Sequence, residues 1–533
     1  MFKSGLITRS AFSIFNGTAK GLTALISILL LSLALPVSAK SKDLPNVIIM
    51  LADDLGWADV GYHGGDIETP AIDRLAEEGV RLEKFYATPI CSPTRAALMT
   101  AKDPIKLGIA YDQIHPWYIA GLAADEYLVS EAFKDAGYQT ALMGKWHLGH
   151  TQEHQLPNAQ GFDEFYGHLH TNTDFYTHKR EGAHDLQHNG KSVDGKGKYL
   201  THIESEQAVN FIQQREKDKP FFLYVPFTAP HSPMQAPRAT IDKYAHLPAE
   251  QHRQIYAAMV DEMDQGIADI LATLDKQSIA DNTIVVFISD NGGSSVFGGQ
   301  NQPLRGQKGQ AFEGGIRVPA VIRWPAQLAA GKIVQQTVSI MDLYPTLLEA
   351  AGIKPNKSHV MDGENMWQAI ASGEKTKRKA PLFFVSEIPV PGMLSLAVIE
   401  DDWKLVQILR EKQTSMQLVS MLFNLADDPN EKNNIIGEHA EKAEALAELL
   451  RVRRSQHPLA GTRGTLVAHP GWVAPYDWTA AVIPSSKLQS NWKNELPFSV
   501  ELRDAIGDRG ILISDEEMEK LEAQREQREK AMQ

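Results

Sequence analysis

Cysteine is nearly missing from this sequence, and its scarcity excludes several kinds of site. Cys91 is the only cysteine among 533 residues. A single thiol cannot form an intramolecular disulfide, and it cannot supply a zinc or iron–sulfur site built from several cysteines. An isolated cysteine is by default a small buried apolar residue, so composition alone gives Cys91 no function.

Basic residues are also in short supply. The chain has 53 Lys and Arg against 66 Asp and Glu, which gives a formal net charge of -13. Nucleic-acid binding needs a broad basic surface that neutralises phosphates, so we exclude nucleic acid as a partner. An anionic ligand would have to be held by a local cluster of cations. The ordinary fractions of hydrophobic (43%) and charged (22%) residues exclude a disordered, collagen-like or polytopic membrane protein.

The N-terminus has the layout of a secretory signal peptide. Three basic residues precede or border an apolar run at residues 22–35, and small residues permit cleavage after Ala39. The run is too short to span a membrane with margin. We therefore predict a signal peptide at residues 1–39, a periplasmic or secreted mature protein, and no stable membrane span after the signal is removed. The alternative is an uncleaved anchor.

Short apolar runs alternate with helical patterns from Pro45 onward. Thr69 as N-cap and Gly79 as a stop signal predict a helix that begins at Pro70. Strands that alternate with helices predict an α/β fold, in which a large sheet is covered by helices on both faces. The predicted buried strands are residues 47–51, 221–225 and 283–288.

The pattern changes near Pro381, which follows a charged stretch at residues 374–379. Strand-like segments at 382–385 and 394–399 are followed by an amphipathic segment at 438–453. We therefore predict a catalytic domain at residues 40–380 and a smaller α+β C-terminal subdomain at 381–533. The subdomain ends in a charged helical tail from Ser514, which we expect to be solvated.

Polar residues follow each of the three predicted strands. Asp53 and Asp54 follow the first, His231 the second, and Asp290 and Asn291 the third. Ligands of parallel α/β sheets bind beyond the carboxyl ends of the strands, so these residues could meet at one site. The alternative for each is turn chemistry. The carboxylate and amide oxygens are hard donors that suit Ca²⁺ or Mg²⁺ better than zinc or copper, and without a cation three clustered carboxylates would repel one another.

The lone cysteine begins the sequence Cys91-Ser92-Pro93-Thr94-Arg95. Pro93 suits the first turn of a helix, which places Cys91 at the helix N-terminus and Arg95 one turn along. Free N–H groups and the helix dipole favour an anion there. The thiol could be an activated nucleophile, although no general-base partner typical of cysteine proteases is apparent nearby.

Several motifs, in order along the chain, resemble those of the sulfatase family, in which the cysteine of Cys-x-Pro-x-Arg is oxidised to formylglycine. One departure is Ala101, where the family more often has glycine before a basic residue. Besides residues 91–95, the resemblance rests on residues 51–56, 137–149, 229–231, 289–293, Lys308 with 313–315, and 422–425 with Asp428, Pro429 and Glu431.

The resemblance implies an alkaline-phosphatase-like fold and hydrolysis of sulfate esters. It implies one Ca²⁺ held by Asp53, Asp54, Asp290 and Asn291, together with residue 91. It also implies a maturation enzyme that converts Cys91 to formylglycine, whose hydrate attacks sulfur and forms a covalent sulfo-enzyme. The remaining roles are also implied: Arg95 orients the hydrate, His147 is the base, Lys145 and Lys308 hold sulfate oxygens, and His231 protonates the leaving oxygen, with or without Lys308.

Four other segments resemble arylsulfatase B within the family, namely residues 56–64, 113–117, 161–167 and 303–306. They imply a galacto-configured saccharide substrate, such as carrageenan or a glycosaminoglycan, with 4-O-sulfate favoured. The loops at residues 113–118 and 168–178 are rich in His, Trp and Tyr, which can stack on sugars. We predict substrate contacts from His115 and Trp117, besides Lys145, His231 and Lys308; packing beneath a loop is the alternative for the first two.

Two other functions stay open at this point. A phosphate or phosphonate monoester hydrolase of the same superfamily is one, although phosphatases there typically use Ser or Thr with paired zinc. A noncatalytic binder of sulfated glycans is the other. The sequence does not decide the saccharide, the sulfate position, endo or exo action, the oligomeric state, or the extent of Cys91 conversion.

Overall fold

A computed structural model describes residues 44–355, 357–387, 394–412, 415–458, 472 and 474–484, with backbone alone at 410–412 and 415–416. The predicted signal peptide and tail helix lie outside these residues. No helix in the described part of the chain has the length and apolar character needed to cross a membrane.

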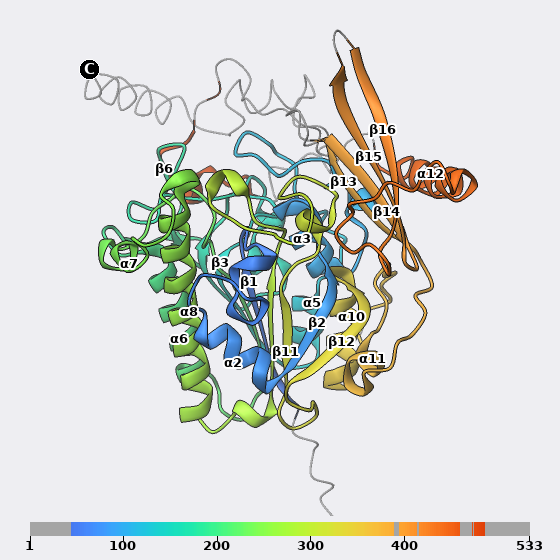
Figure 1. Cartoon of the computed structure of the whole chain (residues 1–533). Coiled ribbons are helices and arrows are strands. Elements are labelled where there is room, and N and C mark those ends of the chain that lie inside the picture. The colour runs from blue at the N-terminus through green and yellow to red at the C-terminus, as the bar shows by residue number, and fades with distance from the viewer. Residues whose placement is uncertain are drawn as a thin grey trace, which may run out of the picture. The chain divides into compact units, whose positions relative to one another are not determined.

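A ten-stranded mixed sheet forms the centre of the large part of the fold (Figure 1). The strand order is β12-β2-β11-β10-β1-β9-β3-β4-β7-β8. Strands β10, β1, β9, β3 and β4 run parallel, whereas β11 and β7 are antiparallel to their neighbours in that block. The strands are β1 (Asn46–Ala52), β2 (Val80–Tyr86), β3 (Gln139–Lys145), β4 (Glu164–His168), β7 (Gln187–His188), β8 (Lys191–Ser192), β9 (Phe221–Pro226), β10 (Thr283–Ser289), β11 (Ala320–Arg323) and β12 (Lys332–Ser339). A separate two-stranded pair joins β5 (Lys179–Arg180) to β6 (Ala183–His184).

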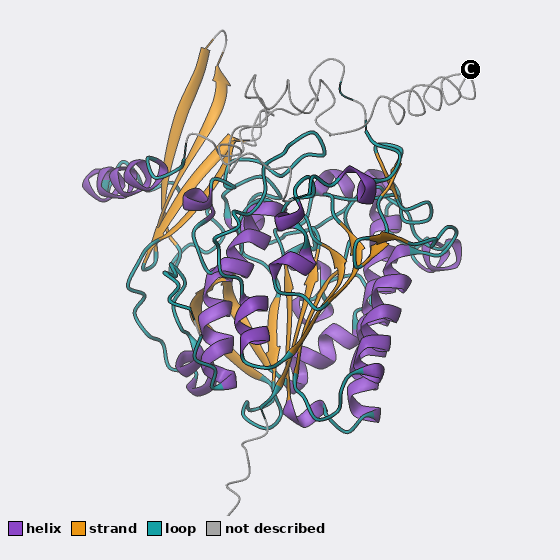
Figure 2. Ribbon diagram, turned by 180° about the vertical axis from the view of Figure 1, so that it is seen from behind, coloured by secondary structure: helices purple, strands orange, loops and turns teal. Residues whose placement is uncertain are grey.

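The central strands are apolar on both faces, as the sequence predicts for buried parallel strands. In β1, Val47, Ile49 and Leu51 pack in one hydrophobic cluster. Ile48 and Met50, which alternate with them, pack in the other cluster across the sheet. Helices cover both faces, as Figure 2 shows from behind, so the predicted α/β architecture is confirmed. The helices are α2 (Pro70–Glu78), α3 (Cys91–Thr100), α4 (Pro104–Leu107), α5 (Val129–Asp135), α6 (Leu200–Gln214), α7 (Arg238–Lys243), α8 (Arg253–Lys276), α9 (Glu313–Ile316), α10 (Leu343–Ala351), α11 (Trp367–Ser372) and α12 (Ala440–Arg454).

Two predicted helix boundaries are confirmed. Thr69 and Gly79 flank α2, which begins at Pro70. Helix α3 begins at Cys91 and ends before Ala101, which adopts the left-handed conformation with a φ of 54°. Because glycine adopts this conformation without a Cβ penalty, the geometry explains why glycine suits this position.

The C-terminal part forms a second, smaller sheet of four antiparallel strands in the order β13-β14-β15-β16, packed against α12. The predicted small α+β region is therefore confirmed, while its boundary at residue 381 stays a prediction. The strands are β13 (Leu382–Glu387), β14 (Leu394–Glu400), β15 (Trp403–Lys412) and β16 (Ser415–Asn424).

A buried charged triad joins this sheet to helix α9. Lys404 on β15 contacts Glu313 at 2.9 Å and Glu431 at 2.8 Å, and all three side chains are inaccessible to solvent. Glu313 begins α9, five residues after Lys308. Glu313 and Glu431, which belong to two of the sequence motifs, therefore both contact the buried Lys404 and help to hold the fold together.

Candidate active site

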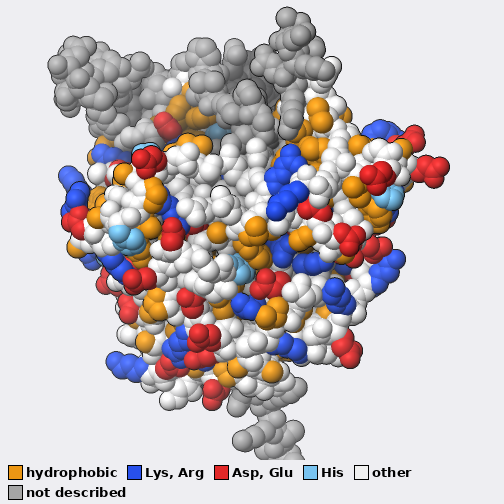
Figure 3. All heavy atoms as spheres, viewed as in Figure 1, with side chains coloured by type: hydrophobic (Ala, Val, Ile, Leu, Met, Phe, Trp, Pro, Cys, Tyr) orange, Lys and Arg blue, Asp and Glu red, His pale blue; other side chains and the backbone are white. Residues whose placement is uncertain are grey.

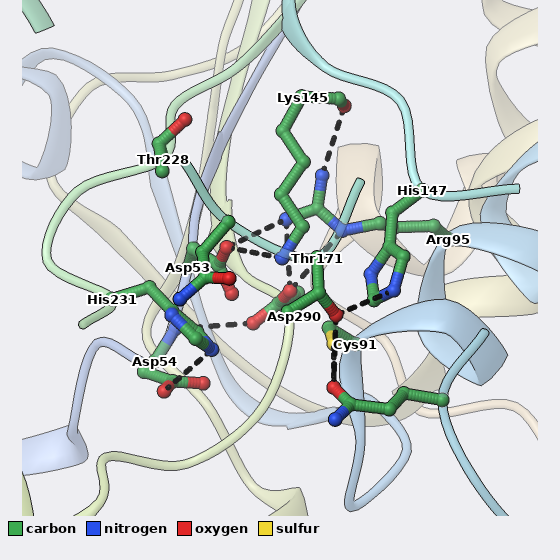
Figure 4. A network of polar contacts seen from close by, with 12 residues as sticks. Asp53, Asp54, Cys91, Arg95, Lys145, His147, Thr171, Thr228, His231 and Asp290 are labelled. Carbon is green, nitrogen blue, oxygen red and sulfur yellow. Dashed lines mark hydrogen bonds and ion pairs between the residues drawn. The ribbon is translucent and has the colours of Figure 1, made fainter. Parts of the chain in front are cut away.

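The carboxyl ends of the parallel strands bring the predicted residues together (Figure 4). Asp53 and Asp54 follow β1, Asp290 and Asn291 follow β10, and Lys145 ends β3. The N-terminus of α3 adds Cys91 and Arg95, and loops add His147, His231 and Lys308. Residues separated by more than 200 positions thus form one buried polar network.

Two site residues adopt the left-handed backbone conformation, which is uncommon for residues other than glycine. Asp54 has a φ of 69° and His147 a φ of 60°. The Asp54 conformation is held by its N–H, which donates to Asp290 Oδ1 at 3.1 Å, and by Asn291 Nδ2, which donates to Asp54 Oδ1 at 2.8 Å. Such a conformation persists where surrounding contacts compensate its cost of about 1 kcal/mol or more.

The glycines of two motifs allow the loop after β10 to meet α9. A Cβ on Gly292 would lie 1.9 Å from the carbonyl oxygen of Gly314, so neither backbone leaves room for a side chain there. This close approach places the loop that carries Lys308 beside Asp290 and Asn291.

Three carboxylates alternate with three cations in the site. Arg95 lies 2.9 Å from Asp290, and Lys145 lies 2.5 Å from Asp53. Lys308 lies 2.7 Å from Asp54. Burial disfavours the charged guanidinium, but Asp290 and Asp53 outweigh it and raise the pKa of Arg95. The repulsion expected among the carboxylates is therefore already offset by protein cations, so it does not by itself require a metal.

Two oxygen atoms of the site that have no hydrogen-bond partner among the described residues suit a hard cation. Within the described part of the chain, the buried atoms Asp53 Oδ1 and Asn291 Oδ1 have no hydrogen-bond partner. A buried acceptor without a partner is costly unless a ligand satisfies it. Ligand atoms of Asp53, Cys91 and Asp290 also lie within 4.8 Å of one another. These donors fit the predicted Ca²⁺ or Mg²⁺, but they do not distinguish the two ions.

Cys91 is fully buried, and its Sγ lies 3.8 Å from Gln113 Oε1. Burial raises the pKa of its thiol and outweighs the opposing effect of Lys145 and Lys308. An unmodified thiol here is therefore not an activated thiolate, in contrast to the alternative that the sequence left open.

His147 presents one ring nitrogen as a base. Its Nε2 lies 3.0 Å from the carbonyl oxygen of Ile114, which can only accept, so Nε2 carries the proton. Thr171 Oγ1 lies 2.6 Å from the same nitrogen and donates in turn to Gln113 Oε1 at 3.0 Å. Burial, Lys145 and Arg95 hold the pKa of His147 well below its usual value. The ring is therefore neutral, and its Nδ1, which has no partner within the described residues, offers a lone pair.

His231 is also neutral. Its Nδ1 donates to the carbonyl oxygen of Ser232 at 2.7 Å, and its Nε2 lies 3.7 Å from Asp54 Oδ2. Burial and Lys308 lower the pKa of His231 to about 3. Although burial opposes it, Asp54 raises the pKa of Lys308. Lys308 is therefore the group that holds a proton before substrate binds.

The two predicted saccharide contacts lie in the loop beside Gln113. His115 is buried, its Nε2 lies 3.1 Å from Asp112, and its ring stacks on Trp117 with centroids 4.6 Å apart. These contacts hold the His115 ring within the fold, and a substrate role for His115 and Trp117 stays a prediction.

Sequence reasoning missed several residues around the site. Thr171 lies in the loop after β4 and His147 in the loop after β3. The two residues meet because β4 pairs with β3 in the sheet, which places the two loops side by side. Glu204, buried on α6, accepts from Thr228 Oγ1 at 2.6 Å, and Thr228 also contacts His168 at 2.7 Å. A glutamate in the middle of a helix gives no sequence signal of burial, because the pattern around it is that of an ordinary helix.

Comparisons with known proteins place these features in a family. The model of the family "Sulfatase" matches residues 45–353, and that of "N-sulphoglucosamine sulphohydrolase, C-terminal" matches residues 307–456. Arylsulfatase J of Mus musculus is 36% identical over 341 residues, 63% of this chain and 57% of that protein. This chain thus spans little more than half of arylsulfatase J.

A second relative and a solved structure extend the likeness. N-acetylgalactosamine-6-sulfatase of Mus musculus is 35% identical over 385 residues, covering 67% of this chain and 72% of that protein. The crystal structure of Ps i-CgsB in complex with k-i-k-neocarrahexaose is 32% identical, with a TM-score of 0.71 over 81% of this chain and 95% of that one.

Proposed function

Because the chain belongs to the sulfatase family of sulfuric ester hydrolases, we propose that it is an exported enzyme that removes sulfate from a sulfated polysaccharide. The observation that carries the proposal is the buried network around Cys91, in which three cations and an unprotonated His147 Nδ1 surround one position. Such a site can bind an anion and take up a proton in the same place.

Two groups complete the proposed site. Formylglycine made from Cys91 by a maturation enzyme would add water, and its hydrate would supply the hydroxyl nucleophile for sulfur. One Ca²⁺ held by Asp53, Asp54, Asp290, Asn291 and residue 91 would supply positive charge that polarises the sulfate. The free oxygens of Asp53 and Asn291 support a hard cation at this position.

Protein side chains would do the rest of the chemistry. The S–O bond of the ester breaks, water is added overall, and the leaving oxygen gains a proton as the alcohol departs. Lys145 and Lys308 would hold sulfate oxygens, Arg95 would orient residue 91, and His147 Nδ1 would accept a proton. A neutral His231 must first gain a proton before it can protonate the leaving oxygen, so Lys308 supports it as the standing proton source.

We propose a galacto-configured saccharide as the substrate. The likeness to Ps i-CgsB, solved with neocarrahexaose, supports a carrageenan or a similar sulfated polymer, and export would bring the enzyme to such polymers in the periplasm or medium. The sequence favours 4-O-sulfate, whereas a named relative is a 6-sulfatase. The test therefore compares substrates that carry sulfate at O4 with substrates that carry it at O6.

Release of inorganic sulfate should be measured on defined galacto-configured oligosaccharides that carry 4-O- or 6-O-sulfate. Cys91→Ala and Cys91→Ser serve as matched variants, and we expect both to lose at least about 1,000-fold in kcat, because each removes the proposed nucleophile. Equal turnover by Cys91→Ala would refute the mechanism. Faster cleavage of an aryl phosphate than of the aryl sulfate would favour a phosphatase, and polymer binding without sulfate release would favour a noncatalytic binder.

A further inference from the structure

A segment near the C-terminal end of the described chain lies against the loops of the candidate active site. We name residues 474–484 the C-terminal strap; Figure 1 shows it in red near β6. Its backbone joins the loop after β3 through two hydrogen bonds. Ile483 N–H donates to Thr151 O at 2.7 Å, and Glu153 N–H donates to Ile483 O at 3.1 Å.

The anchor of the strap is Trp478, which is only 1% exposed. Its ring centroid lies 3.9 Å from that of His170 and 5.5 Å from that of His150. Its Nε1 donates to the carbonyl oxygen of Arg180 at 3.2 Å. Asp185 holds the other side of His170, with its Oδ2 2.7 Å from His170 Nδ1. The His170 ring is therefore clamped between a carboxylate and an indole.

The two residues after His170 are linked to both candidate catalytic histidines, Thr171 directly and Asn172 through a shared carbonyl oxygen. Thr171 Oγ1 lies 2.6 Å from His147 Nε2. Asn172 Nδ2 donates at 2.7 Å to the carbonyl oxygen of Ser232, which also accepts from His231 Nδ1. Asn172 Oδ1 accepts from the Arg180 side chain at 2.5 Å. Arg180, whose carbonyl oxygen accepts from Trp478, therefore also fixes the Asn172 amide. Figure 4 shows Thr171 beside His147, with His231 on the other side of the network.

We propose that Trp478 is a positioning residue, which fixes residues 170–172 and through them the orientation of His147 and His231. This inference rests on the proposed function, since it assigns a role in proton transfer. Loss of the indole would leave Asp185 as the remaining support of the His170 ring and would free the Arg180 carbonyl oxygen, so that Thr171 and Asn172 would hold the two imidazoles less firmly in one geometry. A loss of alignment of this kind slows proton transfer without removing a reacting group.

The proposal predicts a split between turnover and anion binding. Arg95, Lys145 and Lys308 are held by the carboxylates of Asp290, Asp53 and Asp54 and not by residues 170–172. Disturbing the strap should therefore lower kcat and leave the inhibition constant of inorganic sulfate unchanged.

The test uses the full-length protein with formylglycine content measured by mass spectrometry, so that kcat refers to converted enzyme. We expect Trp478→Ala to lower kcat on an aryl sulfate at least about tenfold and to change sulfate inhibition less than about twofold. Trp478→Phe keeps a ring on His170 and should recover most of the loss. Tyr476→Ala is the matched control, because that side chain belongs to the same strap but is 59% exposed.

An unchanged kcat in Trp478→Ala would overturn the proposal, and so would a parallel loss of kcat and sulfate binding. Should Trp478→Ala not fold, Asn172→Ala decides, because it removes the amide that joins Arg180 to the Ser232 carbonyl oxygen and leaves Trp478 in place. Its kcat should fall more for alkyl than for aryl sulfates, since only the poorer leaving group needs a well-placed acid; an equal effect would contradict the proposal.

A wild-type protein that releases no sulfate would refute the proposed function. The effect of the C-terminal strap on residues 168–172 could still be measured by amide hydrogen exchange. Trp478→Ala should speed exchange in residues 168–172 relative to Tyr476→Ala, and unchanged protection there would overturn the positioning role.

Discussion

Glu204 is predicted to make the stability of the protein fall as pH rises. The side chain is fully buried on α6, and it accepts from both the N–H and the hydroxyl of Thr228. Burial raises the pKa of its carboxyl from 4.5 to about 8, more than the Thr228 hydrogen bonds lower it. In the unfolded chain the carboxyl ionises near its usual pKa, so the folded state binds the proton more tightly.

The sign and size of the effect follow from linkage. Below about pH 4.5 Glu204 is protonated in both the folded and the unfolded state, so its full contribution to stability is present. Between that pH and about 8 the carboxyl ionises in the unfolded state but not in the folded state, so the free energy of unfolding falls. Each tenfold difference in proton affinity corresponds to about 1.4 kcal/mol, so a rise in the pKa of Glu204 from 4.5 to about 8 sets an upper limit of about 5 kcal/mol near pH 9. Solvent penetration and relaxation reduce it, and we expect about 1–3 kcal/mol.

The assay is urea unfolding followed by tryptophan fluorescence at about pH 5, 7 and 9. Glu204→Gln keeps the shape and hydrogen bonds of the protonated acid but cannot ionise. Its free energy of unfolding relative to wild type should therefore increase with pH. Glu206→Gln, which changes an exposed glutamate of the same helix, is the control and should track wild type. If Glu204→Gln also tracks wild type at every pH, the buried acid is not held protonated and the reasoning fails.

Three further predictions concern the site and its support. Removal of divalent ions with a chelator should lower kcat, and Ca²⁺ should restore it; Asn291→Ala should raise the Ca²⁺ concentration needed, and chelator-insensitive activity would exclude the metal. Thr171→Val should lower kcat about tenfold or more by removing the hydroxyl on His147, with Thr171→Ser close to wild type, and equal rates for Val and Ser would contradict this. Lys404→Met should destabilise the fold by about 3–5 kcal/mol, because it leaves Glu313 and Glu431 buried without their cation; an unchanged urea midpoint would show that the triad carries no such cost.

Local patterns predicted the elements that position the site. The runs at residues 47–51, 221–225 and 283–288 are the cores of β1, β9 and β10, since continuous apolar residues mark strands buried on both faces. Polar residues directly after such strands must lie at one edge of the sheet, so Asp53 and Asp290 could be placed together from the sequence.

Contacts that depend on tertiary packing could not be predicted in this way. The ring of Trp478 meets His170 across about 300 residues of chain, and no periodicity relates the two. The protonation of His147 and His231 depends on which backbone carbonyl each ring nitrogen faces, a detail set by loops rather than by residue type. Composition also made Cys91 resemble an ordinary core residue, and its burial alone would support that interpretation.

The burial of Cys91 has a consequence for biosynthesis. The proposed maturation enzyme could not reach a side chain with no exposed surface, so the proposed conversion of the thiol would have to come before the fold closes around it. Contacts that support the loops around the site come from late parts of the chain: Lys404 and Glu431 contact Glu313, five residues after Lys308, and Trp478 packs on His170. All of these segments follow position 91 in the chain, so the proposed modification could take place before their contacts form, and closure of the fold before it would trap an unconverted thiol.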